Sequence, residues 1–170
     1  MSKIACVITD YFEDVEYTEP AKAFKDASHQ VVTIEKEKGK QITGKQGDAT
    51  IIIDQSIDDV KPSDFDALFI PGGFSPDSLR GDDRFVDFVK SFMDDKKPVL
   101  AICHGPQLLL TAKKLEGRIA TGFKSIMVDM AYAGATVKDQ EVVVSENQLV
   151  TSRMPDDIPA FNKEALKLLA

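Results

Sequence analysis

The feature that most constrains this chain is a short apolar run, residues 99–102, that stops at a cysteine and leads into a second apolar pattern. A continuous apolar run of this length is typical of a buried parallel strand. Beyond it, the spacing of Leu108, Leu109 and Ala112 is typical of a helix that packs back onto the strand. Cys103 is therefore predicted to lie at a strand-to-helix bend.

Cys103 has neighbours that suit a nucleophile at such a bend. Ala101 and Gly105, two residues before and two after it, are small enough to let the chain turn tightly and leave the sulfur facing solvent. This is the layout of a nucleophile elbow, with cysteine where hydrolases often carry serine. The first N–H groups of the helix are expected to favour the thiolate. The alternative is a buried, unreactive cysteine, which is how free cysteines usually occur.

Length, charge and cysteine content narrow the class of protein. The 170 residues suit a single domain spanning residues 1–170, and 43% hydrophobic content is enough for a sizeable core. The net charge is -7 with no run of Lys and Arg, so neither nucleic acid nor a membrane is expected as a partner. With no apolar stretch of about 18 residues and no signal-peptide pattern, we expect a cytoplasmic protein whose Cys6 and Cys103 are reduced.

Apolar runs and periodicity predict alternating strands and helices. Strands are expected at residues 3–9, 31–34, 49–53, 67–70, 99–102, 118–121, 142–145 and 149–152, with a loop or small hairpin at 36–47. Helices are expected up to residue 27, from an N-cap at Asp82, after Gly105, and at 125–133 and 158–169; Pro20 should lie in a first turn or at a kink. This alternation predicts an α/β fold, a mostly parallel sheet with helices on both faces.

In such sheets, ligands bind at the carboxyl ends of the strands. Three predicted loops meet at that edge of the sheet. They carry Glu13, Asp14 and Glu16, then Gly72 and Gly73, then Cys103 and His104. A site built from these three loops is therefore expected.

A cysteine nucleophile needs a partner for its proton. The chain has only two histidines, and His29, at a helix-to-strand junction, is interpreted as a surface residue. Because His104 directly follows Cys103, the two side chains are expected to diverge. We expect His104 instead to supply its backbone N–H, which with that of Gly73 forms an oxyanion hole. The alternative for the His104 ring is simple packing at the rim of the site.

The acidic residues of the first loop are alternative activators of the sulfur. A half-buried carboxyl has a raised pKa and can donate a hydrogen bond to a thiolate as a neutral acid. The residues alone do not choose among Glu13, Asp14 and Glu16. A metal held by Cys103, His104 and an acid is a further alternative. The sequence lacks the G-x-G-x-x-G, Walker, C-x-x-C and H-E-x-x-H motifs, and no cofactor is expected.

Four motifs in this order closely resemble the ThiJ/PfpI family, its PfpI-type members and general stress proteins; they span residues 12–16, 70–73, 101–107 and 151–157. The resemblance implies a flavodoxin-like sandwich that assembles as a homodimer or hexamer. It also implies Cys103 as nucleophile and Glu16 as the acid bonded to it. Gly72, Gly73 and His104 would bind the oxyanion or substrate. An acid of a neighbouring subunit, matching Asp77 here, would orient the histidine.

The leading functional prediction is a stress-related cysteine hydrolase, a deglycase or glyoxalase-like enzyme acting on methylglyoxal or its protein adducts. An elbow thiol beside an acid suits activated carbonyls, because amide cleavage needs a general acid at the leaving nitrogen. One alternative is an intracellular cysteine peptidase that pairs His104 with Asp77 of another subunit. Another is a redox sensor or chaperone whose Cys103 stops at sulfinate. Arg153 is interpreted as a salt-bridge partner of Asp156 or Asp157, or as part of the site rim.

Overall fold

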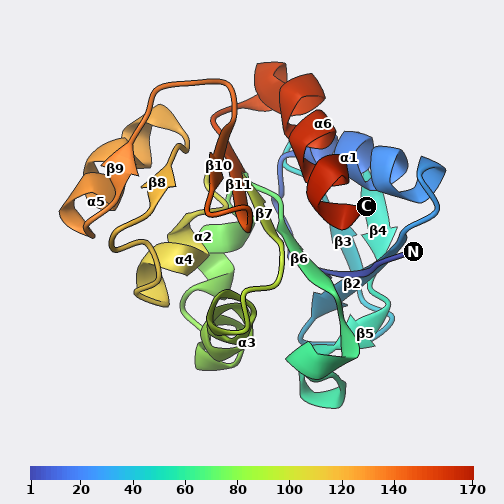
Figure 1. Cartoon of the computed structure of the whole chain (residues 1–170). Helices are drawn as coiled ribbons and strands as arrows, with labels where there is room; N and C mark the ends of the chain where they lie inside the picture. Colours follow the sequence, from blue (N-terminus) through green and yellow to red (C-terminus); the bar gives the residue numbers. More distant parts are fainter.

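A seven-stranded sheet forms the centre of the protein (Figure 1). The computed structural model describes residues 1–170. The strand order is β10-β11-β7-β6-β1-β2-β5, and every neighbouring pair is parallel except β10 and β11. The expected mostly parallel sheet is confirmed. Its strands are β1 (Lys3–Val7), β2 (Gln30–Glu35), β5 (Gln55–Ser56), β6 (Ala67–Ile70), β7 (Val99–Ile102), β10 (Val143–Ser145) and β11 (Leu149–Ser152).

Helices cover both faces of this sheet, as the alternation of elements predicts. Alternate residues of a strand point to opposite faces, so Ala5 and Val7 of β1 join one apolar core while Ile4 and Cys6 join the other. Helices α3 (Asp83–Asp94) and α4 (Gln107–Thr111) pack on the first core. Helices α1 (Asp14–Asp26) and α6 (Ile158–Leu169) lie side by side over the second (Figure 1). None of the helices has the length and apolar character needed to span a membrane.

The segment 36–53 differs from its prediction. The strand expected at 49–53 is not in the main sheet; β3 (Gln41–Thr43) and β4 (Thr50–Ile52) form a separate antiparallel hairpin. Among these six residues only Ile42 is fully buried, so the segment lacks the burial on both faces that a central parallel strand has. The sheet edge is formed instead by the two residues of β5. The turn of this hairpin contributes to the candidate site described below.

The remaining elements are short, and several were not predicted. Helix α2 (Ser75–Leu79), which follows the glycine pair, and β9 (Thr136–Val137) are among these. The strand expected at 118–121 is β8 (Ile119–Ala120), which pairs in parallel with β9. The helix expected at 125–133 is a 3₁₀ turn, Lys124–Ile126, that continues into α5 (Met127–Tyr132). Asp82 caps α3 as predicted, because its Oδ1 accepts the Arg84 N–H at 3.0 Å. Pro20 lies inside α1, beyond the first turn.

Candidate active site

Cys103 lies directly after β7 in the strained geometry of an elbow. Its φ is +62°, a left-handed value that residues other than glycine seldom adopt. The Gly105 N–H donates to the Ile102 carbonyl at 2.8 Å and closes the turn. A Cβ at Gly105 would lie 2.6 Å from the Ile70 carbonyl oxygen, so the predicted need for a small residue there is confirmed.

The sulfur is less exposed than the sequence predicts. Cys103 is only 6% exposed and lies at a cavity of about 200 Å³. Helix α4 begins four residues later, at Gln107, and is only five residues long, so its dipole adds little at the sulfur. The cavity is lined by Glu13, Glu16, Lys45, Gly73, Phe74, Cys103, His104, Phe123 and Pro155.

Glu16 is the acid that the structure places against the sulfur. It belongs to the first turn of α1, is fully buried, and its Oε1 accepts the Gly72 N–H at 3.1 Å. Its Oε2 is buried without a hydrogen-bond partner. Burial raises the pKa of Glu16 to about 8, although its interaction with Cys103 and the Gly72 N–H oppose the shift. Glu16 is therefore a neutral acid at pH 7, and protonation of Oε2 gives it a donor for the sulfur.

The pKa of the Cys103 thiol is raised, so the expectation of a lowered pKa is wrong. Burial raises the pKa of Cys103, and the neighbouring Glu16 carboxyl raises it further. The backbone N–H groups of His104 and Gly73 act in the opposite direction, as expected of two donors that face the sulfur. Once one proton has left the buried pair of Cys103 and Glu16, the remaining charge opposes loss of the second. The two groups therefore share a single proton above about pH 8.

The other two acids of the loop, Glu13 and Asp14, bind other groups than the sulfur. Glu13 Oε2 forms an ion pair with the Lys45 ammonium at 2.9 Å, at the cavity wall. Asp14 is 2% exposed and accepts three backbone N–H groups of the hairpin turn, from Gln46, Asp48 and Ala49, at 2.8 to 2.9 Å. The structure thus settles a choice that the residues alone left open.

Replacing Asp14 with alanine is expected to lower the free energy of unfolding by about 2 kcal/mol, because three N–H groups lose their acceptor. Burial alone would raise the pKa of Asp14, but these N–H groups lower it overall. The contribution is therefore present above the ordinary aspartate pKa and lost as the pH falls below it. Urea unfolding checks this, with Asp48→Ala, an exposed carboxylate in the same turn, as control. Equal stability of the two variants would refute the role of Asp14.

The His104 ring lies closer to the sulfur than predicted. Its Nδ1 is 3.4 Å from Cys103 Sγ, and its Nε2 is 3.4 Å from Ser125 Oγ. The ring also packs against Phe123, with centroids 4.6 Å apart. The positive φ of Cys103 turns the backbone enough for the two neighbouring side chains to meet, so the expectation that they diverge is wrong.

The charge state of His104 follows from its surroundings. Burial lowers the pKa of His104, the Lys45 charge lowers it further, and Asp77 of the same chain opposes both. The ring is therefore neutral at pH 7 and can take or pass a proton. Asp77 lies in α2. Its contact across a subunit boundary stays a prediction.

The glycine pair contributes two different N–H groups. Gly73 has φ +76°, as its predicted turn requires, and it pairs as an isolated β-bridge with Phe12. Its N–H faces the sulfur. The Gly72 N–H donates to Glu16, so Gly72 holds the acid in place and has no donor left for an oxyanion.

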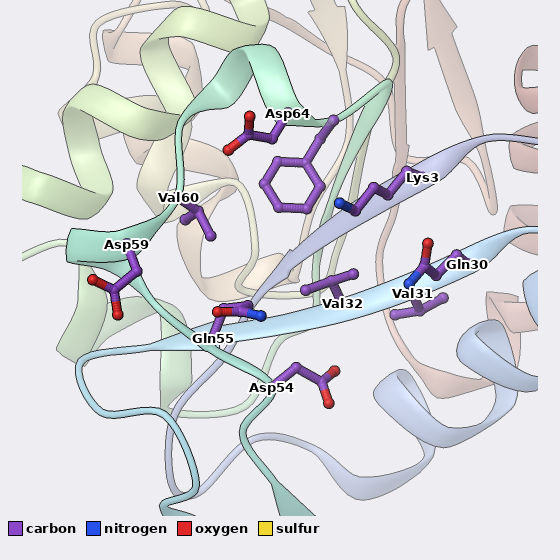
Figure 2. A pocket seen from close by; sticks show the side chains of 10 residues that line it. Lys3, Gln30, Val31, Val32, Asp54, Gln55, Asp59, Val60 and Asp64 are labelled. Carbon is purple, nitrogen blue, oxygen red and sulfur yellow. The ribbon is translucent and has the colours of Figure 1, made fainter.

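A larger cavity, of about 490 Å³, lies at the opposite end of the sheet (Figure 2). Lys3 and Gln30, at the start of β1 and β2, line it together with Asp54, Gln55, Asp59 and Asp64. Two of its carboxylates accept backbone N–H groups: Asp54 that of Thr33 and Asp64 that of Lys61. It contains no cysteine or histidine, so the smaller cavity at Cys103 is the candidate site.

The other predicted residues lie outside the site. His29 Nδ1 accepts the Ser2 N–H at 2.9 Å, far from the sulfur along the sheet. Cys6 is fully buried and forms no disulfide, as predicted. Arg153 forms ion pairs with Asp157 at 2.9 Å and Asp139 at 3.0 Å, which confirms its salt-bridge interpretation. The structure gathers no three His, Cys, Asp or Glu side chains in an arrangement suited to a metal ion.

Comparison with known proteins finds one family, and relatives that match nearly the whole chain. The DJ-1/PfpI family matches residues 2–168. General stress protein 18 of Bacillus subtilis is 71% identical over 98% of this chain and 97% of its own length. Protein/nucleic acid deglycase 2 of Escherichia coli is 59% identical over 98% of this chain and 97% of its own length. "Putative cysteine protease YraA" of B. subtilis is 58% identical over 98% of this chain and 98% of its own length.

Solved structures agree with this result. A two-domain protein from Anabaena variabilis with DJ-1/ThiJ/PfpI-like and ferritin-like domains superposes with a TM-score of 0.96 at 37% identity, over 99% of this chain and 48% of that chain. The ThiJ/PfpI domain protein from Brachyspira murdochii gives a TM-score of 0.91 at 28% identity, over 98% of this chain and 95% of that chain. The flavodoxin-like α/β fold is thus shared with these proteins.

Proposed function

Because this chain belongs to the DJ-1/PfpI family, we propose that it is a cytoplasmic, stress-related hydrolase whose Cys103 adds to reactive carbonyls, with methylglyoxal and its protein adducts as substrates. One relative is named a general stress protein and another a deglycase. The observation that carries the proposal is the buried pair of Cys103 and Glu16, which faces the N–H groups of Gly73 and His104. A cavity of about 200 Å³ suits a small substrate.

The reaction needs no oxidant and no added group except water. Glu16 loses its proton at about pH 8. The ionised carboxylate then takes the thiol proton while Cys103 Sγ bonds to the aldehyde carbon. The aldehyde oxygen becomes an oxyanion held by the N–H groups of Gly73 and His104, then accepts that proton. Glu16 next moves the hydrogen of the former aldehyde carbon, as a proton, to the ketone carbon, while the hydroxyl proton of the first oxygen passes to the ketone oxygen. These two transfers leave a thioester of a 2-hydroxy acid on Cys103. Water cleaves the C–S bond and releases a 2-hydroxy acid and the thiol.

The rate of this reaction is expected to follow the ionisation of the pair. Below about pH 8 both groups are protonated, so kcat/KM for methylglyoxal should rise about tenfold per pH unit and level off above pH 8. The loss of dicarbonyl, followed from pH 5.5 to 9.5, measures the profile, and NMR identifies lactate as product. A flat profile, or no consumption, would contradict the proposal.

A second candidate function is peptide hydrolysis. The 3.4 Å separation of His104 Nδ1 and Cys103 Sγ favours it, because a histidine in this position can protonate a leaving amine. We propose that this activity would require a homodimer or hexamer in which Asp77 of one subunit orients His104 of another. Asp77→Asn should then lower cleavage of a fluorogenic peptide about tenfold or more. Full peptide cleavage by a monomeric species would contradict this candidate.

A further inference from the structure

Lys45 is a cation in the wall of the candidate site that no motif singles out. We infer that its ammonium binds the second oxygen of a 2-oxoaldehyde and stabilises the negative charge that develops there, which makes Lys45 a catalytic residue of the proposed reaction. The inference rests on the proposed function. It extends that function by assigning a group to the oxygen that the backbone donors do not hold.

The Lys45 side chain is held in place from several directions. Its backbone N–H donates to the Phe12 carbonyl at 2.8 Å, and its ammonium pairs with Glu13 at 2.9 Å. The ammonium also lies 5.5 Å from the centre of the Phe74 ring. The turn that carries Lys45 is itself fixed by Asp14, which accepts hydrogen bonds from three of its backbone N–H groups. A donor fixed in this way loses little freedom when substrate binds.

The charges around the cavity leave Lys45 available for substrate. Glu13 is the one acceptor that the structure gives its ammonium, so two of the three N–H bonds remain for a ligand. Among the lining residues, Glu16 and His104 are neutral at pH 7, and Lys45 is the only lysine or arginine. Lys45 lines the same cavity as Cys103 and Glu16, so its charge acts on both groups.

The chemistry requires a second donor. When the hydrogen of the former aldehyde carbon leaves as a proton, the electron pair of that bond moves toward the ketone oxygen and gives an enediolate. The first oxygen is already held by the N–H groups of Gly73 and His104. The new charge therefore needs its own partner, and an ammonium group in a small cavity suits it. The proton of the first oxygen then passes to the second oxygen, and reprotonation at the ketone carbon gives the neutral thioester without any outside reactant.

The test compares Lys45→Met and Lys45→Arg with Lys38→Met, an exposed lysine of the preceding segment, as control. Loss of one such donor typically costs about 100-fold in kcat, so we expect this fall for Lys45→Met on methylglyoxal, with KM changed much less. Lys45→Arg should retain much of the rate, and Lys38→Met all of it. Thermal unfolding shows whether each variant is folded, and Lys45→Gln replaces Lys45→Met if that variant is not.

Alkylation of Cys103 by iodoacetamide separates this role from a simple effect on the thiol. Alkylation has no second oxygen to stabilise, so on the plateau above the transition Lys45→Met should alkylate within about twofold of the wild type, while kcat falls about 100-fold. The transition itself should move to higher pH, because the Lys45 charge lowers the pKa of Glu16. An equal fall in both rates would mean that Lys45 acts through the sulfur, and an unchanged kcat would mean that it does not act; either result overturns the inference alone. A wild-type protein that consumes no methylglyoxal would overturn the proposed function as well.

Discussion

Cys103→Ser is expected to lower the rate of methylglyoxal consumption at least about 1000-fold. The serine hydroxyl fits the same elbow, but its proton is far harder to remove than that of a thiol, and an alcohol beside a carboxyl of pKa about 8 stays protonated. The N–H groups of Gly73 and His104 remain, so a small residual rate is compatible with the account. Progress curves of dicarbonyl loss at pH 8 measure the effect.

Cys6→Ala is the matched control for this variant. Cys6 is fully buried in β1 and takes no part in the site, so its removal should leave the rate unchanged although it opens a small gap in the core. If Cys103→Ser keeps more than about a tenth of the wild-type rate, the carbon–sulfur bond is not part of the reaction and the proposed mechanism fails.

Glu16→Gln is expected to change activity and stability together. The amide keeps the shape of the side chain but cannot take the thiol proton, so kcat/KM should fall about 100-fold or more at pH 8. The rise of the rate between pH 6 and 8 should disappear, because the group with pKa about 8 is gone. Steady-state kinetics on methylglyoxal across this range measure both effects.

The stability effect has a defined sign. The folded protein holds Glu16 protonated up to about pH 8, whereas an unfolded glutamate loses its proton near pH 4.5. The contribution of Glu16 is therefore complete below pH 4.5 and is lost as the pH rises through 8. At about 1.4 kcal/mol per pKa unit, the wild type should lose up to about 5 kcal/mol relative to Glu16→Gln over this range.

Urea unfolding of both proteins at several pH values between 4.5 and 8.5 measures this difference. Glu19→Gln, an exposed glutamate on the same helix, is the control and should follow the wild type. If the difference between wild type and Glu16→Gln does not change with pH, Glu16 is not held as a neutral acid, and its proposed role with Cys103 is wrong.

Much of the fold could be predicted because its central strands are continuous apolar runs. The expected strands at 67–70 and 99–102 and the helix at 158–169 agree with the structure residue for residue. The hairpin β3–β4 was harder to predict, because three-residue strands with one buried side chain show no clear hydrophobic periodicity. In the same way, the short helix α2 had no recognisable pattern.

The site was only partly predictable, because charge states depend on burial, which the sequence does not show. Cys103, Gly73 and His104 follow from the elbow and the loop order, but only the family resemblance selects Glu16 among three acids. Burial then reverses the predicted direction of the thiol pKa. Lys45 reaches the cavity from a distant polar turn that Asp14 organises, a contact with no signal in local sequence.

The central claim is that Cys103 and Glu16 share one proton, which makes the sulfur reactive near pH 8. The most direct test is the rate of Cys103 alkylation by iodoacetamide as a function of pH, in the wild type and in Glu16→Gln. We expect a transition at about pH 8 in the wild type that moves to higher pH in the variant, where the buried thiol has no base. The same transition in both proteins, or a wild-type sulfur already fully reactive at pH 6, would contradict it.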